Sequence, residues 1–241
     1  MPGKLFGSAV TAAVVTAAAV SALAPTTAWA VSARLSNARI TEHFDLTAGQ
    51  KPENIAFAPN GDMYVTFAVG RQVAEISRTG AVRILATLPA PADSGVHTPV
   101  MGFPLTTGIV RTPSGALYFL YATGTADLTG VWQLTPGGRP KRIAALPANG
   151  LPNGLALDAR TGTLYITDSV LDTIWRVPAT GGTPTVWSTA TELASAGFLG
   201  VNGLKIHDGA IWATNLDQGT VLRIPVLPNG SAGLSGPRPP G

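Results

Sequence analysis

Short apolar segments alternate with polar turns along most of the chain, and the same arrangement returns four times. Each copy has an apolar segment, a turn that contains glycine, and a second segment with an aromatic residue near its start. Valine, isoleucine, leucine, tyrosine and tryptophan dominate the segments, and glycine, proline, asparagine and aspartate lie between them, as in strands and their turns. No segment carries a convincing helical period, so the pattern predicts an all-β protein.

Aligned glycines at Gly108, Gly154 and Gly203 mark the repeat, with Asn54 in the same place in the first copy. A spacing of about fifty residues with several strands per unit is typical of a β-propeller. An additional lone strand is expected at Ile40–Leu46. The strands expected in the four units are Asn54–Ala58, Met63–Ala68, Gln72–Ser77 and Ala81–Leu88; Gly108–Thr112, Leu117–Tyr121, Gly130–Leu134 and Lys141–Leu146; Gly154–Asp158, Leu164–Thr167, Thr173–Val177 and Thr183–Ser188; and Gly203–His207, Ile211–Asn215 and Thr220–Val226.

The fourth unit stops after three strands, and residues 228–241 form a tail rich in glycine and proline that we expect to be disordered. Open blades leave apolar faces and strand edges bare, so a propeller must close. Three explanations stay open: a C-terminally truncated copy of a longer propeller, which we favour; four blades closed by Ile40–Leu46 as the outer strand of the fourth; or pairing with another chain.

The first thirty residues differ from the rest. Lys4 is the only charge before Arg34, Leu5–Leu23 is a weakly apolar run, and Ala28-Trp29-Ala30 supplies a small-x-small pattern. This predicts a secretory signal peptide over residues 1–30, a partial propeller over 31–227, and an extracellular or cell-envelope location. The alternative is an uncleaved membrane anchor.

Composition narrows the possible partners. The chain has 241 residues, 45% apolar and 12% charged, with a net charge of +3 and no Lys/Arg run, which argues against nucleic acid. Without cysteine it has no disulfide and no thiol nucleophile. We expect a small-molecule ligand, no membrane contact after signal cleavage, and a monomer unless open blades pair.

Polar residues come just before each aligned glycine. Because the innermost strands of a propeller start at one end of the channel, these residues should converge there. Such an oxygen-rich set suits a hard cation or a polyhydroxy ligand, although asparagine and glycine can also simply form the turns that lead into the strands. His97, in the long insertion Pro89–Pro104, should lie at this end and touch the ligand. The set, called the polar ring below, is Glu53, Asn54, Thr106, Thr107, Asn153 and Asn202.

Three phrases carry a resemblance to a known family. They are Leu151–Leu157 (LPNGLAL) followed by Leu164–Ser169 (LYITDS), Glu53 four residues before Phe57, and Asn202-Gly203-Leu204 followed by Ile211-Trp212-Ala213. Over roughly residues 50 to 227 the chain resembles the six-bladed propellers that include gluconolactonase, senescence marker protein and luciferin-regenerating enzyme. The resemblance implies a six-bladed type of propeller, of which about four blades are present here.

Enzymes of that family bind one divalent cation, usually calcium. By matching motif, the resemblance implies Glu53, Asn153 and Asn202 as metal ligands, Glu53 and Asn202 as catalytic positions, and Thr106 as a substrate contact beside Thr107. Asn202 replaces the family's catalytic aspartate, and an amide is neither an anionic ligand nor a base at neutral pH.

Three functions therefore stay open. The chain is a secreted calcium-dependent hydrolase of a lactone or sugar-derived ester, a non-catalytic propeller that binds a small polar ligand or a protein, or an inactive truncated product.

Overall fold

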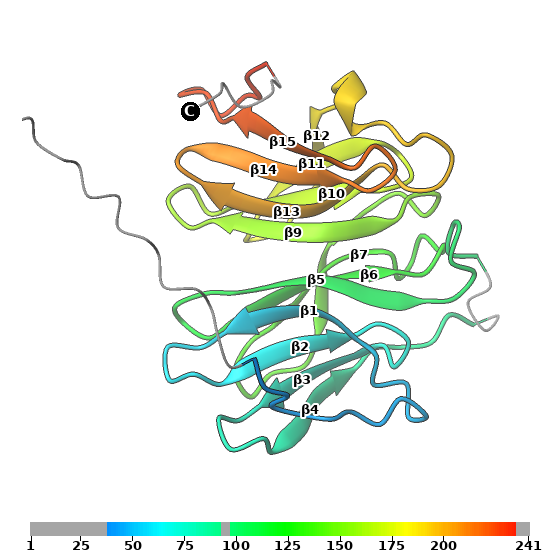
Figure 1. Cartoon of the computed structure of the whole chain (residues 1–241), viewed down its shortest axis with the longest axis vertical. Helices are drawn as coiled ribbons and strands as arrows, with labels where there is room; N and C mark the ends of the chain where they lie inside the picture. The colour runs from blue at the N-terminus through cyan, green and yellow to red at the C-terminus, as the bar shows by residue number, and fades with distance from the viewer. Residues whose placement is uncertain (1–37, 93–96, 235–241) are drawn as a thin grey trace, which may run out of the picture. The chain divides into compact units, whose positions relative to one another are not determined.

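Four antiparallel sheets follow one another along the chain in the computed structural model, which describes residues 38–92 and 97–234 (Figure 1). Each strand pairs with the next in sequence, so every sheet is a meander. The sheets, called blades 1 to 4, consist of β1 (Pro52–Phe57), β2 (Met63–Phe67), β3 (Gln72–Ile76) and β4 (Val82–Thr87); β5 (Leu105–Arg111), β6 (Leu117–Ala122), β7 (Gly130–Leu134) and β8 (Lys141–Ala145); β9 (Pro152–Asp158), β10 (Thr163–Asp168), β11 (Thr173–Pro178) and β12 (Thr185–Ser188); and β13 (Val201–His207), β14 (Ala210–Asn215) and β15 (Thr220–Pro225).

The four predicted units are confirmed as four blades, and the fourth blade has three strands. The innermost strands β1, β5, β9 and β13 contact one another in this order, as Figure 1 shows. The one helical element among the described residues is a single 3-10 turn at Thr191–Leu193, and none of them forms a helix long and apolar enough to cross a membrane. The architecture is a partial β-propeller.

Apolar side chains from adjacent blades pack together because alternate residues of each strand point to opposite faces. Phe119 and Tyr121 of blade 2 pack with Val73 of blade 1. The tyrosine near the start of the second strand in blades 1 to 3 packs in a cluster with residues of the following blade. Tyr165, for example, is 3% exposed and packs with Leu204 and Ile211 of blade 4, and its ring lies 5.1 Å from that of Trp187 in its own blade, edge to face. The joints between blades are therefore the hydrophobic core.

The lone strand predicted at Ile40–Leu46 is not formed. The segment instead packs on blade 1, where the Phe44 ring lies 4.9 Å from the Phe67 ring. It does not complete blade 4, so the four-blade closure through this segment is wrong. Packing of Phe44 against the apolar cluster of blade 1, which contains Val65, Phe67, Ala74 and Ile76, stabilises the observed position of the segment.

Residues 228–234, assigned to the tail by the sequence, fold back beside blade 4. Val226 and Ala232 form an isolated antiparallel bridge. The Gly230 carbonyl accepts hydrogen bonds from Trp187 Nε1 at 2.9 Å and from a terminal guanidinium nitrogen of Arg176 at 2.8 Å. The predicted signal peptide and residues 235–241 lie outside the described residues.

Candidate functional site

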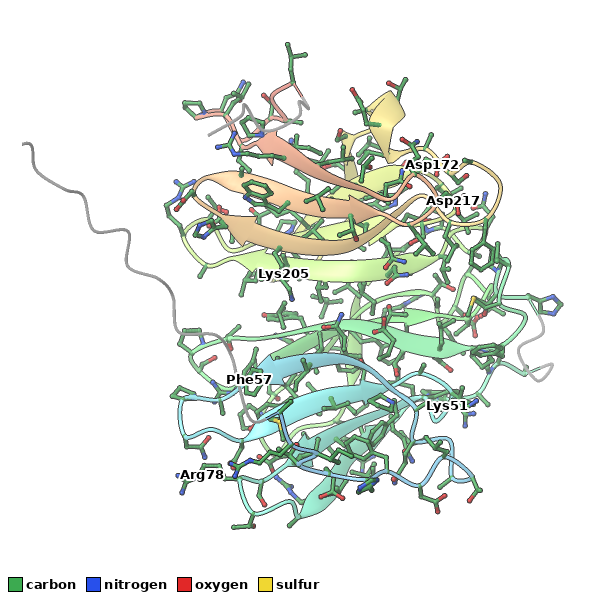
Figure 2. The ribbon with its side chains drawn as sticks, viewed as in Figure 1. Lys51, Phe57, Arg78, Asp172, Lys205 and Asp217 are labelled. Atoms are coloured by element: carbon green, nitrogen blue, oxygen red, sulfur yellow. The ribbon has the colours of Figure 1, made fainter. Side chains whose placement is uncertain are left out.

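The innermost strands start at the same end of the propeller unit. Figure 2 shows Lys51, just before β1, at the same end as Asp172 and Asp217, whereas Phe57, the last residue of β1, and Lys205 lie toward the other end. Four polar-ring residues hold the same second position in their strands: Glu53 in β1, Thr106 in β5, Asn153 in β9 and Asn202 in β13. Contacts between neighbouring inner strands give these positions the order of the blades, and the hollow that Glu53 lines includes neither Asn153 nor Asn202.

Glu53 is the one acidic residue of the polar ring. No hydrogen bond or ion pair is recorded for its carboxylate within the part of the chain that the structure describes. Although solvent reaches the residue, nearby protein atoms desolvate the carboxyl group and raise its pKa to about 7. Glu53 lines a hollow of about 270 Å³ together with Asn54, Met63, Val65 and Phe44. A ligand can therefore reach the Glu53 carboxylate, and no recorded hydrogen bond or ion pair among the described residues stabilises its charge.

Thr106 and Thr107 are buried at the joints between blades. The Thr106 hydroxyl donates to the Phe67 carbonyl of blade 1 at 2.9 Å, and the Thr107 hydroxyl donates to the Pro152 carbonyl of blade 3 at 2.8 Å. Their exposed fractions are 0% and 1%. Both hydroxyls therefore form hydrogen bonds that join adjacent blades. Sequence reasoning missed this, because the acceptors lie about forty residues away in adjacent blades.

The three asparagines of the ring differ. Asn54 Oδ1 accepts the N–H of Ile55 at 2.9 Å, so this side chain bonds locally within β1, next to the irregularity in its pairing with β2 between Pro52 and Asn54. Asn153 and Asn202 are half-buried. The backbone carbonyl of Asn202 accepts the hydroxyl of Thr167, while no hydrogen bond is recorded for the side-chain amide of either residue among the described residues. Both amides are free to contact a ligand.

Other acids at this end hold loops in place. Asp168 is fully buried, and its Oδ1 accepts the N–H groups of Leu151, Val170 and Leu171 at 2.8–3.2 Å. Burial raises the pKa of Asp168, and these bonds oppose the rise. Asp217 Oδ2 accepts the N–H groups of Phe198 and Ala196, which lower the pKa of this carboxyl. Asp168 and Asp217 therefore cap turns that follow the second strands of blades 3 and 4.

The described end of the insertion that contains His97 packs at the start of β5. Thr98 is buried, and its hydroxyl lies 3.5 Å from the carbonyl of Ala122, the residue paired with Leu105. Met101 and Phe103 join an apolar cluster at the same place. His97 itself is exposed, and its contact with a ligand stays a prediction.

The inner strands also line an open, largely apolar hollow that the sequence did not predict. It has a volume of about 380 Å³, and all four inner strands contribute to it. Ile55, Ile109 and Leu155 are among its apolar residues, and Arg111 and Lys205 bring positive charge. The channel is therefore polar where the strands start and apolar and cationic farther along them.

The donor set fits a divalent cation in kind but not in charge. Glu53, Asn153 and Asn202 offer only oxygen ligands, as calcium prefers. Among the described residues, however, no group of three or more His, Cys, Asp and Glu side chains is placed to hold a metal ion. With one carboxylate, a cation would be held weakly.

Comparison with solved structures decides the fold. A catalytically inactive virginiamycin B lyase from Staphylococcus aureus, solved with quinupristin, matches with a TM-score of 0.59 and 20% identity over 80% of this chain and 57% of that one. A luciferin-regenerating enzyme matches with a TM-score of 0.54 and 14% identity over 77% and 62%. A protein of unknown function from Bacteroides caccae matches with a TM-score of 0.53 and 11% identity over 77% and 60%.

The chain has the fold of these propellers. It spans less than two thirds of the length of these three structures. Residues 28–73 also match the family model described as strictosidine synthase-like, N-terminal. No curated protein matches the sequence significantly. At these identities the matches establish the propeller fold, which is also the fold of the luciferin-regenerating enzyme named above.

Proposed function

We propose that the chain binds a small polar ligand where its inner strands start, with Glu53 as the central contact. One observation carries the proposal: the Glu53 carboxylate lines a hollow, has a pKa of about 7, and has no recorded partner among the described residues. Glu53 is exposed, so a ligand can reach its carboxyl group, and a cation that pairs with the carboxylate would favour the charged form over the protonated one. The Asn153 and Asn202 amides, free of recorded bonds, would orient such a ligand.

A hard cation such as calcium is the first candidate ligand. Glu53, Asn153 and Asn202 would hold it, and when bound it would supply a positive charge that orients the oxygen atoms of a small polar molecule. A single anionic ligand suggests a dissociation constant on the order of 1 mM, the range of extracellular modules. The predicted export of the chain therefore belongs to this proposal.

Binding is better supported than hydrolysis by the residues present. Asn202 stands where a base would be needed, and its amide does not accept a proton at neutral pH. One observation nevertheless favours hydrolysis of a lactone or sugar-derived ester as a second candidate: a carboxyl with a pKa of about 7 is suited to general-base catalysis near neutral pH. Glu53 is the group that would take the proton.

Calcium titration monitored by thermal unfolding tests the binding proposal. At about ten times the dissociation constant, the melting temperature of the wild type should rise by roughly 3 °C. Glu53→Gln should abolish the rise. Asp127→Asn, in the exposed turn between β6 and β7, is the matched control and should retain it. A wild type that shows no calcium-dependent shift would exclude a divalent cation at Glu53.

A panel of lactones and sugar esters tests the second candidate. If Glu53 is a base, turnover should rise with pH through about 7 and disappear in Glu53→Gln. Asn202→Asp should raise the rate by restoring an anionic group. Absence of turnover in both the wild type and Asn202→Asp would leave binding as the function.

A further inference from the structure

A second hollow with polar walls lies at the joint between blades 1 and 2, and we call it the joint hollow. It has a volume of about 420 Å³, in the usual range of small-molecule sites, and all of its lining residues fall between Tyr64 and Gly138. Tyr64 of β2 lines it, whereas the neighbours of Tyr64 in the strand, Met63 and Val65, line the Glu53 hollow. Because alternate residues of a strand point to opposite faces of the sheet, the two hollows lie on opposite faces of blade 1.

The acidic residue of the joint hollow, Glu75, is already paired. In the register of the sheet, Glu75 lies between Tyr64 and Arg83. Arg83 donates to Glu75 Oε2 through Nε at 3.0 Å and through a terminal nitrogen at 2.5 Å, and the Tyr64 hydroxyl donates to Oε1 at 3.0 Å. These three bonds compensate the charge of Glu75, so this carboxylate does not prevent an anion from entering the hollow.

Arg111, the last residue of β5, brings a positive charge to the joint hollow, and no ion pair is recorded for it among the described residues. Its Nε is buried and has no recorded hydrogen-bond partner there, and Nη1 donates to the Thr112 carbonyl at 3.1 Å. The guanidinium carbon lies 5.7 Å from the centre of the Tyr64 ring, and a Cβ at Gly115 would lie 3.4 Å from Nη2. The guanidinium is therefore held between a tyrosine of blade 1 and a turn of blade 2, and Nη2 is left to bind an acceptor.

Apolar side chains lie beside this charge. Leu117 of β6 and Leu134 of β7 are buried, Leu85 of β4 is half-buried, and all three line the joint hollow. The turns before β6 and after β7 form its rim, with Ser114 and Thr135 among their residues. A molecule in the joint hollow would therefore meet a cation together with an apolar wall.

The equivalent positions at the joint between blades 2 and 3 are occupied differently. Tyr118 of blade 2 holds the strand position of Tyr64, and its hydroxyl accepts a hydrogen bond from Gln133 Nε2 at 2.9 Å. The inner strand of blade 3 ends at Asp158, where that of blade 2 ends at Arg111. Since an acidic residue takes this position in blade 3, the repeat itself does not require arginine there. The positive charge distinguishes the joint hollow from the next joint.

We propose that the joint hollow binds a small organic carboxylate. The carboxylate group would accept a hydrogen bond from Arg111 Nη2, and the apolar body of the molecule would lie against Leu117 and Leu134. A guanidinium forms strong, charge-assisted hydrogen bonds with a carboxylate and is weakly hydrated, which suits a half-buried position. This ligand and the ligand proposed at Glu53 would occupy opposite faces of blade 1, so neither would block the other.

Titration with benzoate, followed through the backbone amide signals in NMR, tests the proposal on the wild type. Benzoate combines a carboxylate with an apolar ring, and its dissociation constant should be on the order of 1 mM. It should shift the amide signals of residues 114–117 and 134–138, which belong to the parts of blade 2 that line the joint hollow. Benzamide, which lacks the charge, and acetate, which lacks the ring, should each bind about tenfold more weakly.

Substitution of the arginine tests its role. Arg111→Gln should weaken benzoate binding by about tenfold or more, and Arg111→Lys should weaken it less, because lysine keeps the charge but not the planar fork. Arg78→Gln, in the exposed turn after β3 and outside the joint hollow, is the matched control and should bind benzoate as the wild type does.

Four results would overturn the proposal. The first is the absence of benzoate binding to the wild type, and the second is binding that a folded Arg111→Gln variant retains in full. The third is a shift of the signals of Leu155 and Lys205 in place of residues 114–117 and 134–138, since Arg111 also lines the apolar hollow of the inner strands. The fourth is inorganic phosphate or benzamide binding as tightly as benzoate. The third and fourth results are measured on the wild type and do not depend on how any variant folds.

Discussion

Blade 3 and blade 1 are copies of one repeat, yet they differ in how far their apolar faces are covered and in whether their acidic residue has hydrogen-bond partners. Blade 3 has a neighbour on each face, and its acid Asp168 is enclosed and accepts three backbone N–H groups. Blade 1 exposes Ile55 and Phe57, and its acid Glu53 has no recorded partner among the described residues. The contrast separates residues that build the propeller from residues that are available for binding.

The largest difference is expected in the aromatic positions. Tyr165→Ala in blade 3 should lower the free energy of unfolding by about 3–5 kcal/mol, because it removes a buried ring that packs on Trp187. Phe57→Ala in blade 1, measured on the monomer, should change it by less than about 0.5 kcal/mol, because that ring is mostly in water. Urea unfolding of the two variants measures both values. Equal losses would show that blade 1 is covered in solution.

The next effect compares two substitutions of one acid. Asp168→Ala should cost about 2–3 kcal/mol in urea unfolding, because the buried N–H of Leu151 and the part-buried N–H groups of Val170 and Leu171 lose their acceptor. Asp168→Asn should cost much less, since an amide oxygen can replace Oδ1, as Asn215 Oδ1 does in blade 4 by accepting the Gln218 N–H. If both variants lose the same stability, the charge of Asp168 and not its acceptor oxygen is what matters.

These positions also show what the sequence allowed us to predict. The glycine-marked period predicted the blades, because the repeat can be read directly from the sequence. The joint formed by Thr106 and Thr107 could not be predicted in this way, because their acceptors belong to adjacent blades. The strand predicted at Ile40–Leu46 was wrong for the same reason. The contact of Phe44 with Phe67, far along the chain, outweighs a strand-like local pattern.

The candidate site likewise has features that the sequence predicts and features that it does not. Its position at the starts of the inner strands follows from the repeat alone. The properties that distinguish its members do not: the desolvation of Glu53, the local hydrogen bond of Asn54 and the burial of Thr106 depend on packing in three dimensions.

The smallest expected effect is the pH dependence that Glu53 contributes. Its folded-state pKa of about 7 is above the ordinary value, so the folded protein retains a proton that the unfolded chain releases. The free energy of unfolding should therefore fall as pH rises toward 7 and then level off. Because solvent reaches Glu53, the fall should be less than about 1 kcal/mol. Glu53→Gln should remove this part of the pH dependence in urea unfolding measured between pH 4 and 8; an unchanged profile would contradict it.

Titration of the Glu53 carboxyl carbon by NMR tests the central claim most directly. Without ligand, the account predicts a pKa of about 7, since no partner stabilises the carboxylate. Saturating calcium should move that pKa well below 7, because the cation binds the deprotonated form. A Glu53 pKa at the ordinary value for glutamate, unchanged by calcium, would contradict the claim that this carboxylate is held ready for a ligand.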